Sequence, residues 1–162
     1  MVYSFQHLPH AVFRGCAAGD SAKLITGSAD SSARLWDLQT GKTLHAFKFN
    51  EPCRAVKFAV GDAMAAISSD PFMGVPACIY LVTIAEDAAE QNTTILQSLK
   101  GPTGRIQRVE WTDLNRTLIS AGEDGIVRRW DVEVRGALRA ATDRGTHHSR
   151  SRCVPDDACA YW

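Results

Sequence analysis

Short apolar runs separated by polar turns rich in Gly, Asp and Ser recur along most of the chain, a pattern typical of β-sheet proteins. The clearest unit is 118–132, which reads LISAGEDGIVRRWDV. Its two apolar runs flank a turn that contains Asp124 and Gly125. This dipeptide supplies the positive φ values that a tight hairpin needs. The stretch therefore predicts a strand, a turn and a second strand.

An earlier stretch, 24–38, repeats this unit without a gap and reads LITGSADSSARLWDL. The matched positions are Asp30, Trp36 and Asp37 in the first copy and Asp124, Trp130 and Asp131 in the second. The copies lie 94 residues apart, which is two steps of 47. That step is close to the roughly 40–45 residues of one blade in a WD-type propeller. We therefore expect a diverged third copy between them.

The expected middle copy spans 54–83. Ala65–Asp70 supplies a strand and turn, and Ile79–Thr83 supplies the partner strand. The Trp-Asp pair is absent, because Thr83 and Ile84 stand 47 residues after the first pair. The middle hairpin is therefore expected to lack the aromatic anchor of the other two.

The middle hairpin is enlarged by a loop over 70–76, in which two prolines prevent strand pairing. Phe72 and Met73 lie on this loop. They either tuck under the loop as a local apolar plug or form part of a partner-docking surface. The sequence favours the plug.

The repeats predict an all-β, WD40-type β-propeller that forms an incomplete arc of about three blades. The expected organisation is a partial propeller over 1–134, with blades at about 11–49, 53–99 and 105–134, and a disordered tail at 135–162. Closed propellers contain about four to eight blades. We therefore expect the sequence to be a fragment or variant product of a longer propeller chain.

In WD-repeat blades the turn Asp holds the hairpin closed, and the Trp buries its ring while its indole N–H keeps a partner. The Gly-His dipeptide that usually completes this network is missing here. We therefore expect Asp30 and Asp124 to accept hydrogen bonds from backbone N–H groups of their turns. Arg129 stands where the first copy has Leu35. Its stem either extends along the blade to solvent or lies at an open, wet face.

The composition excludes several classes of function. Lys plus Arg and Asp plus Glu number 18 each, so no overall charge draws the chain to nucleic acid or to an anionic membrane. No apolar run is long enough to span a bilayer. The five cysteines are odd in number and irregularly spaced, which favours reduced thiols in the cytosol. His147, His148, Cys153 and Cys159 form a poor match to the tight spacing of zinc ligands, so no metal is expected.

Several segments resemble subunit I of eukaryotic translation initiation factor 3. They include 24–30 (LITGSAD), 58–62 (FAVGD), 99–102 (LKGP) and 114–124 (LNRTLISAGED), and the most specific is the loop 69–73 (SDPFM). The resemblance covers roughly Leu24–Asp131. It implies a seven-bladed propeller that is a non-catalytic scaffold in the cytoplasm, without cofactor.

The same resemblance implies particular partners. A member of this family docks other subunits of the factor, notably b and g, during assembly of the 43S pre-initiation complex and recruitment of mRNA to the 40S ribosome. Contact with the ribosome is then indirect, and neither a membrane nor direct nucleic-acid binding is expected.

Three alternatives stay open. A WD-repeat substrate receptor of a ubiquitin ligase usually carries Arg two residues after the Trp-Asp pair, where this chain has Gln39 and Glu133. An enzyme would need a nucleophile with its base, or paired carboxylates in a pocket, and no such constellation is recognisable. The chain could also be a non-functional truncated product.

Overall fold

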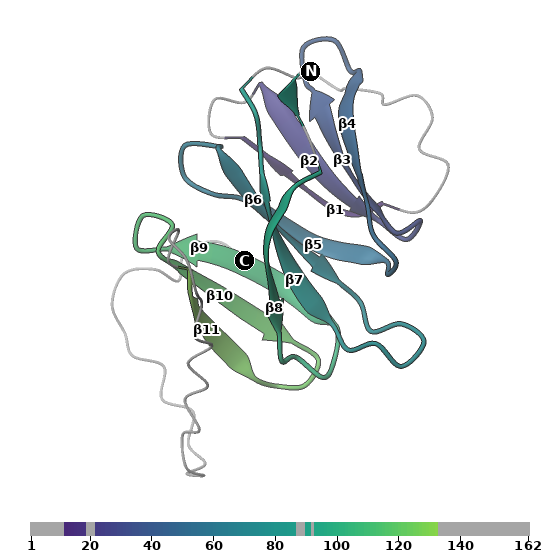
Figure 1. Ribbon diagram of the computed structural model, residues 1–162, viewed down its shortest axis with the longest axis vertical. Helices are drawn as coiled ribbons and strands as arrows, with labels where there is room; N and C mark the ends of the chain where they lie inside the picture. The colour runs from purple at the N-terminus through teal and green to yellow at the C-terminus, as the bar shows by residue number, and fades with distance from the viewer. Residues whose placement is uncertain (1–11, 19–21, 87–89, 92, 133–162) are drawn as a thin grey trace.

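The computed structural model describes residues 12–18, 22–86, 90–91 and 93–132, and these form eleven strands in three antiparallel sheets (Figure 1). The expected all-β fold with about three blades is confirmed. The tail predicted at 135–162 lies outside the described residues.

Each sheet is built from strands that follow one another in the chain. The first contains β1 (Val12–Ala17), β2 (Lys23–Ser28), β3 (Ser32–Asp37) and β4 (Thr43–Lys48). The second contains β5 (Cys53–Phe58), β6 (Met64–Ser69), β7 (Cys78–Thr83) and β8 (Ile95–Lys100). The third contains β9 (Ile106–Thr112), β10 (Thr117–Gly122) and β11 (Val127–Asp131).

The first strands of the sheets meet at the centre of the arc. β5 lies against β1 on one side and against β9 on the other. Each sheet then runs outward from this centre in chain order, as the arrangement in Figure 1 shows. The second sheet is thus enclosed between the first and the third.

Two apolar layers fill the spaces between the sheets. The layer between the first and second sheets includes Ile25, Leu35, Phe47, Val56, Ile67 and Val82. The layer between the second and third sheets includes Ile79, Leu81, Leu99, Val109, Leu118 and Trp130. Burial of such side chains stabilises the fold by about 1.5–3 kcal/mol each.

The pattern of buried residues along each strand shows which faces of its sheet are covered. Five of the six residues of β6 are buried, because this strand has a neighbouring sheet on each face. In β11 only Trp130 is buried, since only one face of the third sheet is covered by the described residues. The first and second sheets approach each other closely at Gly27, where an added Cβ would lie 2.8 Å from the carbonyl oxygen of Cys53. Glycine is required there by space.

Strand pairing corrects one detail of the repeat alignment. Leu24 of β2 pairs with Trp36, and Ala65 at the corresponding place in β6 pairs with Val82. Val82, and not Thr83, therefore replaces the tryptophan in the second sheet. A fixed step of 47 fails there because the segments between equivalent strands differ in length: Leu24 and Ala65 are 41 residues apart, and the longer β6–β7 loop raises the step to 46 between Trp36 and Val82.

Candidate docking surface and the turns that support it

The turn aspartates of the first and third sheets hold their hairpins in the same way. The Oδ1 of Asp30 accepts the backbone N–H of Ser32 at 3.0 Å, and its Oδ2 accepts Nη2 of Arg34 at 2.9 Å. The Oδ1 of Asp124 accepts the N–H of Ile126 at 3.2 Å, and its Oδ2 accepts Nη1 of Arg128 at 2.7 Å. The expected contact between turn Asp and turn backbone is confirmed at both sites.

These contacts favour the ionised carboxylates. Burial opposes ionisation of Asp30, but hydrogen bonds from Ser32 and Ser28 and the nearby Arg34 outweigh it and lower its pKa. Burial likewise opposes ionisation of Asp124, and the Arg128 guanidinium with two backbone N–H groups lowers its pKa. Both turns are therefore held by charged acceptors at neutral pH.

The tryptophans that follow these turns are buried with their donors satisfied. The indole N–H of Trp36 donates to the Thr26 hydroxyl at 2.9 Å, and that of Trp130 donates to the Ser120 hydroxyl at 2.8 Å. Thr26 and Ser120 are themselves buried and occupy equivalent positions in β2 and β10. Each indole N–H therefore donates to a hydroxyl on the adjacent strand, although the Gly-His dipeptide is absent.

The other predicted structural residues lie at the ends of their strands. Asp37 accepts the N–H of Gln39 at 2.8 Å and the hydroxyl of Thr40 at 2.6 Å, which closes the β3–β4 turn. These hydrogen bonds lower its pKa. Asp131 is exposed at the end of β11. Their contribution to stability stays a prediction.

A further group of side chains joins the connection between β4 and β5 to β7. Glu51 is buried, and its Oε2 accepts the Tyr80 hydroxyl at 3.2 Å. The Tyr80 ring stacks on Phe49 with centroids 4.8 Å apart. Burial, together with Cys78 and Glu51, raises the pKa of Tyr80 to about 12. The hydroxyl therefore remains a donor at neutral pH.

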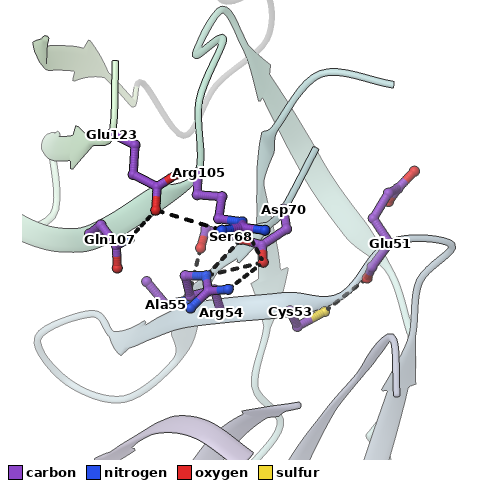
Figure 2. Close-up of polar contacts among 9 residues, drawn as sticks. All are labelled: Glu51, Cys53, Arg54, Ala55, Ser68, Asp70, Arg105, Gln107 and Glu123. Atoms are coloured by element: carbon purple, nitrogen blue, oxygen red, sulfur yellow. Dashed lines mark hydrogen bonds and ion pairs between the residues drawn. The ribbon is translucent and has the colours of Figure 1, made fainter. Parts of the chain in front are cut away.

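The β6–β7 loop is fastened at its base by Asp70. Its backbone N–H donates to the Pro52 carbonyl at 2.8 Å, and its buried carboxylate receives Nε of Arg54 at 2.8 Å and Nη2 at 2.7 Å (Figure 2). This two-point contact fixes the direction in which the loop leaves β6. Hydrogen bonding to Asp70 raises the pKa of Arg54.

The same carboxylate links the second sheet to the third. Arg105, just before β9, lies 3.8 Å from Asp70 and 3.9 Å from Glu123. Gln107 donates to Glu123 at 2.8 Å, and Figure 2 shows these side chains converging between the two sheets. The base of the loop is therefore tied to both sheets.

The tip of this loop presents apolar side chains to solvent. Phe72 and Val75 exchange two backbone hydrogen bonds, at 3.0 and 2.8 Å, around Met73 and Gly74. Met73 has φ 47° and Gly74 has φ 84°, positive values at both central residues of the turn. Met73 is 89% exposed, Val75 47% and Phe72 44%. The favoured interpretation of Phe72 and Met73 as a buried plug was wrong, because the two-residue turn directs Met73 away from the sheets.

Within the part of the chain that the structure describes, no group of three or more His, Cys, Asp and Glu side chains is placed to hold a metal ion. The cluster His147, His148, Cys153 and Cys159 lies outside the described residues. Among the residues that the structure describes, no helix is long and apolar enough to cross a membrane.

Comparison with protein families agrees with the repeat geometry. The model of the WD domain, G-beta repeat, matches residues 2–37 and 93–131. The chain therefore contains two segments that match this repeat. Both matched segments end at the Trp-Asp pair of a hairpin, so the match rests on the turns and tryptophans described above.

The chain also resembles curated proteins named eukaryotic translation initiation factor 3 subunit I. Identity is 33% to the Bombyx mori protein over 69% of this chain and 34% of the relative. It is 32% to the Dictyostelium discoideum protein over 76% and 37%, and 29% to the Drosophila melanogaster protein over 80% and 39%. The chain thus spans little more than a third of the length of these relatives.

Two features of the surface were missed from the sequence. One is the ion-pair group around Asp70, whose members Arg54, Asp70, Arg105 and Glu123 come from four separate segments. The other is Asn115, whose side chain accepts the N–H of Val60 and donates to its carbonyl, both at 2.7 Å. No local pattern marks either of them, because each joins residues that only the packing of neighbouring sheets brings together.

Proposed function

We propose that this chain is a non-catalytic docking scaffold of eukaryotic translation initiation factor 3. In this role it binds other subunits, notably b and g, in the cytoplasm during assembly of the 43S pre-initiation complex and recruitment of mRNA to the 40S ribosome. The names of the curated relatives support the proposal that the chain is part of this factor. The surface chemistry supports docking as the activity.

The observation that carries the proposal is the β6–β7 loop tip. An apolar side chain in solvent is unfavourable, and a positive φ at a non-glycine residue adds conformational cost. Met73 combines both on a loop whose base is fixed by Asp70 and Arg54. A rigid apolar tip of this kind loses little entropy on binding. It therefore fits a protein partner with an apolar pocket.

The test measures binding of the full chain to purified subunits b and g. Burying a methionine contributes about 1.5–3 kcal/mol, so Met73→Ser is expected to weaken binding about tenfold or more. Leu114→Ser is the matched control, because Leu114 is 85% exposed and also has a positive φ of 51°. The turn that carries Leu114 contacts Val60, which follows β5. The base of the loop that carries Met73 contacts Pro52, which precedes β5. The control and the tested residue therefore lie at opposite ends of that strand.

Retained binding by Leu114→Ser together with weakened binding by Met73→Ser supports the loop as the docking surface. Equal binding by both variants contradicts it. Failure of the unaltered chain to bind either subunit, with capture of ubiquitin-ligase adaptors instead, would overturn the proposed scaffold role.

A further inference from the structure

One arginine of the ion-pair group around Asp70 is incompletely paired. The Nε of Arg105 lies 3.8 Å from Oδ2 of Asp70, and its Nη1 lies 3.9 Å from Oε1 of Glu123. Both distances exceed that of an N–H···O hydrogen bond. The guanidinium donates no hydrogen bond to any residue that the structure describes, and the side chain is 55% exposed. Its N–H donors can therefore bind an acceptor from outside the chain.

The two carboxylates near Arg105 are held by closer donors. Asp70 accepts Nε and Nη2 of Arg54 at 2.8 and 2.7 Å, and Glu123 accepts Nε2 of Gln107 at 2.8 Å. Ion pairs as long as those of Arg105, on a side chain that is half exposed, contribute little to stability. An acceptor that binds Arg105 therefore displaces no strong contact within the chain.

Arg105 lies close to the apolar tip of the β6–β7 loop. Figure 2 shows its side chain between Glu123 and Asp70, the residue at which the loop begins. Met73 follows Asp70 by three residues, so their Cα atoms are at most about 11 Å apart. Met73 is 89% exposed, and its neighbour Phe72 is 44% exposed. One short segment of a partner can therefore reach both the guanidinium and the tip.

We propose that Arg105 and the β6–β7 loop tip form one docking surface, in which Arg105 binds the carboxylate of an Asp or Glu side chain at the rim of the apolar pocket that receives Met73. This pairing rests on the proposed docking function and defines the chemistry of its partner. Arginine binds a carboxylate through two parallel N–H···O bonds, which fix the orientation of the partner. Arginines are also frequent among the residues that dominate the binding energy of interfaces.

The charges around Arg105 favour a carboxylate over a phosphate. Arg54 and Arg105 carry two positive charges, and Asp70 and Glu123 carry two negative charges. A phosphate group brings a charge of about −1.5 to −2, whereas a carboxylate brings about −1. The carboxylate therefore meets less repulsion from Asp70 and Glu123.

The first experiment measures binding of the full chain to subunits b and g produced in bacteria, which lack eukaryotic phosphorylation. Loss of hydrogen bonds to a charged group weakens binding about tenfold or more, and this loss is expected for Arg105→Gln. Arg129→Gln is the matched control, because the Arg129 side chain is 76% exposed and its ion pair with Asp113 is 3.6 Å long. It is expected to bind as tightly as the unaltered chain.

The dependence of binding on salt separates a charged contact from a structural role. Raising the salt concentration from about 0.05 to 0.5 M screens charge interactions, so binding of the unaltered chain and of Arg129→Gln should weaken with salt. Binding of Arg105→Gln should weaken less steeply. All three proteins are expected to unfold at the same urea concentration, since the ion pairs of Arg105 and Arg129 are long and exposed.

Failure of the pairing can be told apart from failure of the docking function. Equal binding by Arg105→Gln and the unaltered chain, with weaker binding by Met73→Ser, would leave docking intact and exclude the acidic partner. Weaker binding by Arg105→Gln with a lowered urea midpoint and an unchanged salt dependence would make Arg105 a structural residue. Binding that appears only after kinase treatment of the subunits would make the acceptor a phosphate. If the unaltered chain binds neither subunit in either form, the docking function and the pairing both fail.

A second experiment identifies the carboxylate of the partner by cross-linking. A carbodiimide joins a lysine amine directly to a carboxylate that lies in contact with it. In Arg105→Lys the new amine is expected to form an amide with an Asp or Glu side chain of subunit b or g, which mass spectrometry of the linked peptides locates. Arg129→Lys is the control and is expected to form no such link. A link that joins position 105 only to Asp70 or Glu123 of the same chain would overturn the proposal.

Discussion

Replacing Ser120 by Ala should reveal how much the third hairpin depends on its buried hydroxyl. The Ser120 side chain is 2% exposed and accepts the indole N–H of Trp130 at 2.8 Å, in a region where Trp130 is 5% exposed. The substitution leaves the N–H buried without its acceptor, and a buried unsatisfied donor costs about 1–3 kcal/mol. Alanine keeps the Cβ, so the substitution removes only the hydroxyl group.

Urea unfolding followed by far-UV circular dichroism measures this loss. With m of about 1–3 kcal/mol/M, the midpoint is expected to fall by about 0.5–2 M with m unchanged. Protein concentration is held constant, because self-association would raise the apparent stability. Ser120→Thr is the matched control, since Thr26 accepts the indole of Trp36 at the equivalent place in the first sheet.

A double-mutant cycle isolates the hydrogen bond from the packing. Trp130→Phe removes the donor, so Ser120→Ala should cost much less in that background than in the unaltered chain. The difference is expected to be about 1 kcal/mol or more. If Ser120→Ala costs the same in both backgrounds, or if Ser120→Thr is as unstable as Ser120→Ala, the hydrogen bond does not stabilise the hairpin and the reasoning is refuted.

Three further predictions concern the turns. Asp124→Ala should lower the free energy of unfolding by about 1–3 kcal/mol in the same urea assay, because it removes the acceptor of Arg128 and of two backbone N–H groups. The lowered pKa values of Asp30 and Asp124 stabilise the fold above pH values near 4, where these groups ionise in the unfolded chain, and this stability is lost as pH falls through the folded-state pKa values. Thermal melts of Asp124→Asn at decreasing pH should therefore show a smaller loss of stability in acid than the unaltered chain. An equal loss in both proteins would contradict this. Asn115→Gly keeps the φ of 70° but loses both hydrogen bonds to Val60, and chemical denaturation should show a loss of about 1–2 kcal/mol, whereas no change would mean that this contact does not join the sheets.

The repeats could be read from the sequence because the forces that form them are local. Alternating apolar residues, the Asp124-Gly125 turn and the repeated Trp-Asp pair each depend on neighbours within one hairpin. They predicted the β2–β3 and β10–β11 hairpins, the contacts of Asp30 and Asp124, and the all-β fold. The middle sheet was located by its spacing, although its tryptophan is replaced by Val82.

The tertiary structure decided the features that depend on contacts between sheets. Phe72 and Met73 were expected to pack under their loop, because apolar side chains usually avoid water. The anchored base and the turn at Met73 and Gly74 instead hold the tip in solvent. The groups around Asp70 and Asn115 also join segments far apart in the chain, so no local pattern encodes them. Hairpin formation was therefore determined by sequence, while the exposure of the β6–β7 loop tip and the ion pairs at its base were decided by the tertiary structure.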